Sequence, residues 1–297
     1  MKAPIVLLQE RDFGQKINAT FQFVIDNFKP LMLSLLYIAG PPALIGGFFM
    51  SSYQSGILGI QQEVLGGGST DLAFSGMYSM FTSILFLFLF LGIAGLAATL
   101  VVNAYLLEYE EGNRAITPET VWNRMKSYIL TSLGYSIVMV LFVGVAALFF
   151  ILPGIYVSVC LSLMYMVLMR ENLDMGDTFR RCFYLIKDKW WSTFGLLVIV
   201  GFISGIIGYI FQIPTMAVMI SSLLQGKGAE APSEVWNVIS GVIATVGSIL
   251  VRSLVLVAIG FQYYNLVERR DGAGIINAIE DLGKTEEARE DKREEEF

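Results

Sequence analysis

Six long apolar segments separated by short polar connections constrain the fold of this chain more than any other feature. Of its 20 Lys and Arg residues, all but Lys227 and Arg252 lie before the first segment, after the last, or in the second and fourth connections. About 20 apolar residues suffice for a helix to cross a bilayer, and loops rich in Lys and Arg stay in the cytoplasm. The pattern therefore predicts an all-α fold, a polytopic membrane bundle of six transmembrane helices with the N-terminus and the C-terminus both cytoplasmic.

The composition agrees with this class of protein. Hydrophobic residues make up 55% of the chain and charged residues 15%, compared with roughly 45–50% and 25% in soluble domains. Pro41 and Pro42 should break or kink the first span, Pro214 should do the same in the fifth, and a tight turn at 152–155 should join the third span to the fourth. We expect the spans at residues 31–53, 77–107, 128–152, 155–169, 193–224 and 235–267.

The cytoplasmic connections carry helical patterns of their own. Apolar residues recur three or four positions apart at about 10–28, 117–127 and 174–190, with charged residues between them. This spacing is typical of amphipathic helices, and their aromatic-rich faces suit the headgroup boundary of a bilayer. In the second of these segments Thr117 is a candidate N-cap, with Pro118 at the first helical position.

The predicted membrane domain comprises residues 1–270, and residues 271–297 form a charged cytoplasmic tail. Within the domain, one interfacial helix followed by two spans recurs three times in the same order. This order indicates three structural repeats, or it reflects only the preference of every inner interface for Lys, Trp and Tyr.

Histidine is absent from the sequence, which excludes several classes of catalytic and metal site. Ser-His-Asp and Cys-His catalysis, histidine-ligated zinc and imidazole bases all require it. The two cysteines, Cys160 and Cys182, are too few for a thiolate metal site, and no predicted span has an Asp or Glu in its middle. We therefore expect no enzymatic activity, no catalytic residue, no metal and no cofactor.

Arg252 is the one charged residue near the middle of a predicted span. An arginine at this depth costs at least about 2.5–3.5 kcal/mol, so its guanidinium should find hydrogen-bond acceptors. Gln212 and Asn103 are candidate partners in other spans. These three residues form either an interhelical hydrogen-bonded site or a site for an anion or a lipid headgroup. An acidic group of a partner protein is a third alternative for Arg252.

Two further sets of residues are candidates for contacts with lipid or with other helices. In the fifth span, Gly201 and Gly205 form a small-xxx-small face, which lets helices approach closely either within the bundle or between two copies of the chain. Basic side chains attract anionic headgroups, and tryptophan rings favour the membrane interface. Candidate lipid contacts of this kind in the fourth connection are Arg180, Arg181, Lys187, Lys189, Trp190 and Trp191.

Residues 152–195 contain a series of motifs: Leu152-Pro153-Gly154-Ile155-Tyr156, Leu161-Ser162-Leu163, Arg170-Glu171-Asn172-Leu173, Thr178-Phe179-Arg180-Arg181, residues 187–191 and Phe194-Gly195. This series resembles the membrane domain associated with bacterial glycerophosphoryl diester phosphodiesterases. The resemblance implies a six-helix bundle in the bacterial inner membrane, with amphipathic helices on its cytoplasmic side. It implies no hydrolase activity here, because in that family the activity belongs to a separate soluble barrel with metal-binding acids and catalytic histidines.

Together these observations favour a non-enzymatic integral protein of the bacterial cytoplasmic (inner) membrane. Its expected role is that of a lipid-interface scaffold or an accessory subunit that organises lipid or partner proteins. The expected partners are membrane lipids with anionic headgroups, other membrane proteins, or further copies of the chain in a homo-oligomer, and no nucleic acid. The alternative is a transporter or lipid translocator with a pathway near Arg252 and Gln212.

Overall fold

The computed structural model describes residues 4–66, 70–149, 151–224 and 234–272. Nearly all of the predicted tail at 271–297, and most of the connection between the fifth and sixth spans, lie outside these residues. The described residues form helices and no strands, so the predicted all-α fold class is confirmed.

Eleven α-helices and one short 3-10 helix make up the described part of the chain. Five of the helical stretches are long and apolar enough to cross a membrane, or six if the bent pair α2 and α3 is counted as one span. The fold is therefore that of a multi-pass membrane protein. In chain order, the elements are α1 (Phe13–Asp26), α2 (Phe28–Ile38), α3 (Gly40–Gly66), α4 (Thr70–Glu110), α5 (Pro118–Met125), η1 (Lys126–Tyr128), α6 (Ile129–Phe149), α7 (Ile151–Leu161), α8 (Met164–Glu171), α9 (Met175–Ile186), α10 (Trp190–Leu224) and α11 (Glu234–Asp271).

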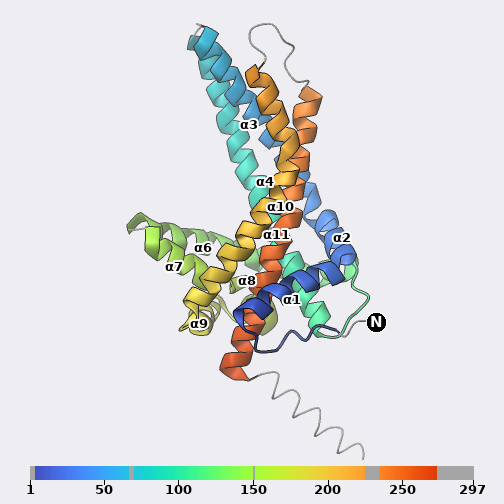
Figure 1. The fold of residues 1–297 in the computed structure, drawn as a ribbon. Coiled ribbons are helices and arrows are strands. Elements are labelled where there is room, and N and C mark those ends of the chain that lie inside the picture. Colours follow the sequence, from blue (N-terminus) through green and yellow to red (C-terminus); the bar gives the residue numbers. More distant parts are fainter. Residues whose placement is uncertain (1–3, 67–69, 150, 225–233, 273–297) are drawn as a thin grey trace, which may run out of the picture.

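Helices α3, α4, α10 and α11 stand side by side and form what we call the stem (Figure 1). Glycine allows α3 and α11 to touch through their backbones. A Cβ atom on Gly47 would lie 2.7 Å from the Cα of Val242, and a Cβ on Gly241 would lie 2.8 Å from the carbonyl oxygen of Gly47. Any side chain at either position would therefore force the two helices apart.

The remaining helices, except α6 and α7, pack around the lower ends of α4, α10 and α11, and we call this region the foot (Figure 1). The ring of Phe23 in α1 meets the rings of Tyr105, Tyr109 and Phe261 edge-on, with centroid distances of 4.9 to 6.1 Å. The closely packed core therefore lies mainly in the foot. Its largest fully buried side chains include Phe23, Tyr105, Met125, Leu163, Phe261, Tyr263 and Tyr264.

Local sequence signals fix where two of the foot helices begin. The predicted N-cap of α5 is present, since the amide of Thr120 donates to Thr117 Oγ1 at 3.3 Å and Pro118 opens the helix. At the start of α9, the amide of Asp177 donates to the carboxylate of Asp174 at 2.8 Å. Each cap supplies an acceptor to an amide that has no partner within its helix.

Proline acts differently in the first and fifth spans. The first span is broken as predicted: α2 ends at Ile38, α3 begins at Gly40, and the helices are bent by 63°. Pro41 and Pro42 occupy the first turn of α3, where the missing amide hydrogens are not needed. In contrast, α10 continues as one helix through Pro214, so the fifth span is not broken there.

Residues 152–155 are helical, so the predicted turn at this position was wrong. Helix α6 ends at Phe149 and α7 already begins at Ile151. Pro153 and Gly154 lie in the first turn of α7, a position that proline tolerates. Gly154 brings the two helices together, because a Cβ there would lie 2.9 Å from that of Ala147.

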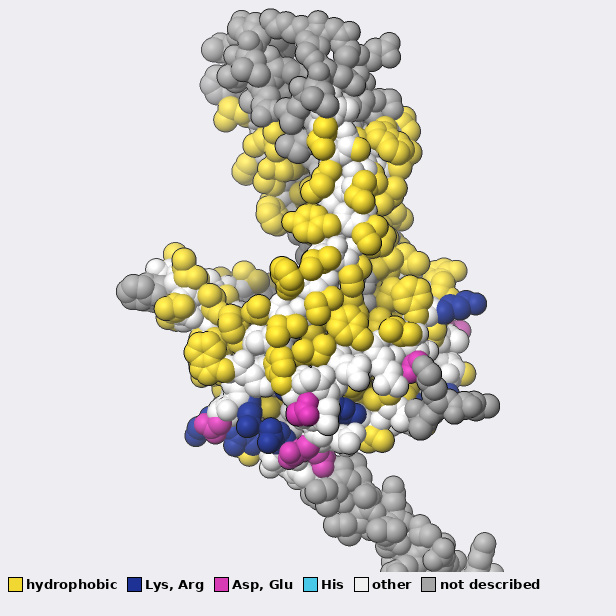
Figure 2. All heavy atoms as spheres, in the orientation of Figure 1, with side chains coloured by type: hydrophobic (Ala, Val, Ile, Leu, Met, Phe, Trp, Pro, Cys, Tyr) yellow, Lys and Arg dark blue, Asp and Glu magenta, His cyan; other side chains and the backbone are white. Residues whose placement is uncertain are grey.

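Helices α6 and α7 form a hairpin, the arm, which projects sideways from the base of the stem (Figure 1). The second of the three predicted repeat units therefore runs in another direction from the first and third. Figure 2 shows apolar side chains over the arm and the stem, with charged side chains below them on the foot. This distribution suits hydrocarbon around the arm and stem and headgroups around the foot. Exposed apolar residues of the arm include Leu130, Ile137, Val140, Leu141, Phe142, Val145, Leu148, Ile151 and Leu152.

Candidate functional site

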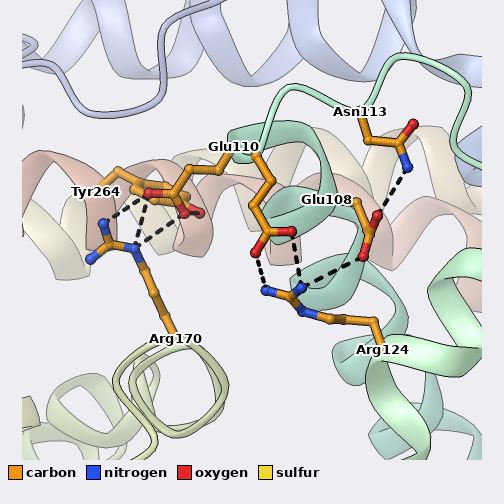
Figure 3. Close-up of polar contacts among 7 residues, drawn as sticks. Glu108, Glu110, Asn113, Arg124, Arg170 and Tyr264 are labelled. Carbon is orange, nitrogen blue, oxygen red and sulfur yellow. Dashed lines mark hydrogen bonds and ion pairs between the residues drawn. The ribbon is translucent and has the colours of Figure 1, made fainter. Parts of the chain in front are cut away.

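An ion pair between the ends of α4 and α8 lies in the foot (Figure 3). Arg170 donates from Nη2 to Glu110 Oε1 at 2.8 Å and from Nε to both carboxylate oxygens, at 3.1 and 3.2 Å. The hydroxyl of Tyr264 in α11 donates to Glu110 Oε2 at 2.7 Å. The side chains of Arg170 and Glu110 are only 20% and 21% exposed. Solvent therefore screens this pair less than it screens a surface ion pair.

A second set of contacts extends this network to α9. Arg181 donates from Nε to Glu171 Oε2 at 2.8 Å, and it also forms an ion pair with Asp271 at the end of α11. The hydroxyl of Tyr263 donates to Glu171 Oε1 at 2.7 Å and accepts from Arg170 Nη1 at 3.4 Å. The network thus connects the foot ends of α4, α8 and α11 with the middle of α9. The sequence predicted lipid contact for Arg181, whereas its guanidinium is engaged within the chain.

A separate ion pair lies nearer the surface of the foot. Arg124 of α5 bonds to Glu111 at 3.0 Å and lies 3.8 Å from Glu108 (Figure 3). Glu108 in turn accepts from the side-chain amide of Asn113 at 2.9 Å. The side chain of Glu111 is 56% exposed, so this pair contributes little to stability.

The other basic candidates for lipid contact differ in exposure and in whether their charges form ion pairs. The Arg180 side chain is 80% exposed and bonds to Asp177 at 2.6 Å. Lys187 is exposed and Lys189 is partly buried, and neither forms an ion pair with another described residue. These two lysines therefore keep their charges available at the corner where α9 meets α10.

The two tryptophans beside these lysines have different surroundings. Trp190 stacks on Tyr156 and Phe194, with ring centroids 5.7 and 5.1 Å apart, and donates from Nε1 to the carbonyl of Tyr156 at 3.2 Å. It therefore holds α7 against α10. The side chain of Trp191 is 77% exposed and remains available to lipid.

Lys16 in α1 is a buried cation, although the sequence pattern predicts that it lies on the polar face of its helix. It is 3% exposed, and Nζ donates to Gln262 Oε1 at 2.8 Å and to Ser192 Oγ at 3.1 Å. Burial lowers the pKa of Lys16 to about 8; Arg269 and Lys189 add to this effect, and Asp12 opposes it. Lys16 lies four residues before Thr20 on the buried side of the same helix, and the spacing alone does not mark that side as buried.

Arg252 and Gln212 line one groove between α10 and α11. Arg252 is exposed there, and Gln212 Nε2 lies 3.4 Å from Ser248 Oγ. Asn103 is buried in α4 and does not belong to the groove lining. The structure therefore brings together two of the three residues predicted for this site.

The glycine face on α10 is open in the single chain. No neighbouring group of the described chain lies within 4 Å of where a Cβ of Gly201 or Gly205 would be. Gly205 belongs to the groove lining, and Gly201 does not. Close packing of this face against a second copy of the chain stays a prediction.

The chemistry of these sites is that of binding and anchoring. In the part of the chain that the structure describes, no group of three or more Cys, Asp or Glu side chains could hold a metal ion. No family model, curated protein or solved structure matches this chain. The fold and the sites define a class, a polytopic α-helical membrane protein with a charged, aromatic foot. The resemblance to the phosphodiesterase-associated membrane domain stays a prediction.

Proposed function

We propose that this chain is a non-enzymatic protein of the bacterial inner membrane that organises lipid or partner proteins at the cytoplasmic leaflet. The observation that carries this proposal is the arm. Its surface is apolar, it projects sideways from the stem, and the charged foot lies directly below it (Figure 2). An apolar hairpin in this position needs hydrocarbon around it, and the foot then lies at the level of the headgroups.

The proposed orientation, with the foot in the cytoplasm, rests on the basic clusters. The first described residues and the end of α11 both lie at the foot (Figure 1). Lys187 and Lys189, which form no ion pair with another described residue, offer charges at this level, and Trp191 offers an exposed ring. Each such basic residue contributes roughly 1 kcal/mol to attraction by an anionic leaflet.

The test is retention of anionic lipid by the purified full-length chain. The protein is purified from membranes containing phosphatidylglycerol and phosphatidylcholine, and bound lipid is counted by native mass spectrometry. The variant Lys187→Gln/Lys189→Gln should retain at least about threefold less phosphatidylglycerol, because two attractive charges are lost. A charge-matched variant elsewhere on the foot, Lys29→Gln/Lys126→Gln, should lose less. Equal retention by both double variants and the wild type would contradict the proposal.

A second candidate function is lipid translocation or transport, with a pathway near Arg252 and Gln212. The observation that favours it is the groove between α10 and α11, which places a cation beside polar side chains within the apolar part of the stem. Flux of a fluorescent phospholipid across vesicles that contain the protein, compared with Arg252→Met, tests this function directly.

A further inference from the structure

The groove between α10 and α11 opens on the surface of the stem that faces lipid. Gly205 and Gly208 create the hollow, since neither has a side chain and no neighbouring group of the described chain fills the space within 4 Å. Exposed apolar side chains, Phe202 and Ile206, lie on the same helix beside it. The volume of the groove is about 410 Å³, and its small or polar lining residues are Ser204, Gly205, Gly208, Gln212, Ser248 and Arg252.

Arg252 gives the groove a positive charge. Twelve residues separate it from Tyr264, which corresponds to about 18 Å along α11. Its guanidinium lies beside α4, since a Cβ on Gly95 would lie 3.8 Å from Nη1 of Arg252. The groove lining contains no Asp or Glu. Within the described ranges, Arg252 forms no ion pair and no hydrogen bond, although its charge acts on the nearby hydroxyl of Tyr165. The guanidinium therefore lacks a counter-anion in a region where water is scarce.

The neighbouring polar groups can also donate hydrogen bonds. Ser204 is 7% exposed, and its hydroxyl has no hydrogen-bond partner in the described part of the chain. Among the described residues, the side-chain amide of Gln212 has one long contact, 3.4 Å to Ser248 Oγ. A guanidinium, a hydroxyl and an amide together complement an anion with several acceptor oxygens, such as a phosphate.

We propose that this groove binds the phosphate of a phospholipid, with Arg252 as its charged contact and Ser204 and Gln212 as additional donors. A phospholipid is the occupant because the groove opens sideways towards hydrocarbon, where its acyl chains can lie against Phe202 and Ile206. This inference deepens the second candidate function, whose pathway the lipid would occupy. It does not depend on the lysines at the corner of α9 and α10.

The experiment measures lipid bound to the full-length protein in detergent by native mass spectrometry. Phosphatidylglycerol is compared with a diacylglycerol of the same acyl chains, which lacks the phosphate. The wild type should bind phosphatidylglycerol at least about tenfold more tightly than diacylglycerol. Arg252→Met, which removes the charge, and Gly208→Leu, which fills the groove, should each reduce this preference several-fold, and the part that persists belongs to the lysines of the foot.

Gly201→Leu provides the matched control, because Gly201 lies on the same helix but outside the groove lining. It should leave the preference for phosphatidylglycerol unchanged. Equal binding of the two lipids by the wild type, or an undiminished preference in both Arg252→Met and Gly208→Leu, would overturn the proposal. Displacement of the lipid by millimolar inorganic phosphate alone would show a site for free phosphate and would overturn the lipid assignment.

Failure of the site and failure of the function can be told apart. If the wild type shows the phosphate-dependent preference but no lipid flux in vesicles, the binding site stands and translocation is removed. If flux persists in Arg252→Met and Gly208→Leu while the preference is reduced, the site again stands and the pathway lies elsewhere.

Discussion

At the scale of single residues, two cations of the chain differ in their burial and in their hydrogen-bond partners. Neither Lys16 nor Arg252 forms a salt bridge with a described residue, but their surroundings differ. Lys16 lies inside the foot with two neutral acceptors, Gln262 and Ser192, whereas Arg252 lies in an open groove. Burial therefore lowers the pKa of Lys16 to about 8.

Docking of α1 should depend on pH through Lys16. The pKa of Lys16 falls from its ordinary value of 10.5 to about 8 in the fold. Between these values the unfolded state binds more protons, so stability should rise with pH from about 8 to 10.5 and be constant below this window. Thermal unfolding in one detergent across this range measures the slope.

Lys16→Met should remove that slope, because the side chain no longer titrates. Lys29→Met is the control, since Lys29 is exposed at the start of α2 and its loss should leave the slope of the wild type. The same pH dependence in Lys16→Met and in the wild type would show that another group is responsible.

At the scale of helices, glycine positions decide which elements touch. Gly47 and Gly241 let the backbones of α3 and α11 meet, and Gly154 does the same for α6 and α7. In contrast, Gly92 in α4 has no neighbouring group of the described chain within 4 Å of a Cβ position. The same residue type therefore has a packing role at some positions and none at others.

Gly47→Ala should destabilise the stem by about 1–3 kcal/mol, because the new methyl group would overlap the backbone of α11. Gly92→Ala should be neutral or stabilising by up to about 1 kcal/mol, since alanine favours helices over glycine. Thermal unfolding of both variants in the same detergent checks this difference. Equal midpoints for the two variants would refute the close contact between α3 and α11.

The sequence predicts many of these elements for clear physical reasons. Apolar length marks the spans, and capping residues such as Thr117 mark helix starts, because both signals are local. The direction of the arm is not local: its apolar residues show only that α6 and α7 seek hydrocarbon. The buried face of α1 is equally hidden, because Lys16 and Thr20 face inward only once α10 and α11 are in place.

The residues of the candidate sites also divide into those that local sequence marks and those that only the fold brings together. The position of Arg252 within its span can be counted along the sequence, so this residue could be predicted to belong to a site. Gln212 lies in the same groove. The partners in the foot could not be predicted. Glu110 and Arg170 are 60 residues apart, and Glu110 and Tyr264 are 154 apart. No periodicity connects positions so distant in the chain.

At the scale of the whole molecule, the ion-pair network joins helices from all three predicted units. Glu110 closes α4, Arg170 and Glu171 close α8, and Asp271 closes α11. Because Arg181 of α9 also takes part, the foot ends of α4, α8 and α11 are held together. We expect the foot to unfold as one unit.

A double-mutant cycle on Glu110 and Arg170 should reveal this coupling. Arg170→Met alone should cost about 1–3 kcal/mol, because it leaves the partly buried carboxylate of Glu110 without its cation. Adding Glu110→Gln should cost less than the sum of the single changes, with a coupling of about 1–2 kcal/mol. Thermal or denaturant unfolding in one detergent supplies the four stabilities.

The matched cycle uses Arg124→Met and Glu111→Gln, an ion pair at the surface of the same foot. Its coupling should stay below about 1 kcal/mol, as for other exposed pairs. If both cycles give the same coupling, the buried network has no special part in holding the helices together.

The sideways arm also gives the protein unequal widths at different depths (Figure 1). With the stem upright, the half of the membrane that contains the arm must make room for six helical segments, and the other half only for the stem. A wedge of this shape widens one monolayer relative to the other, and the membrane relaxes by curving. Copies of this protein should therefore gather where the membrane is convex on the arm's side.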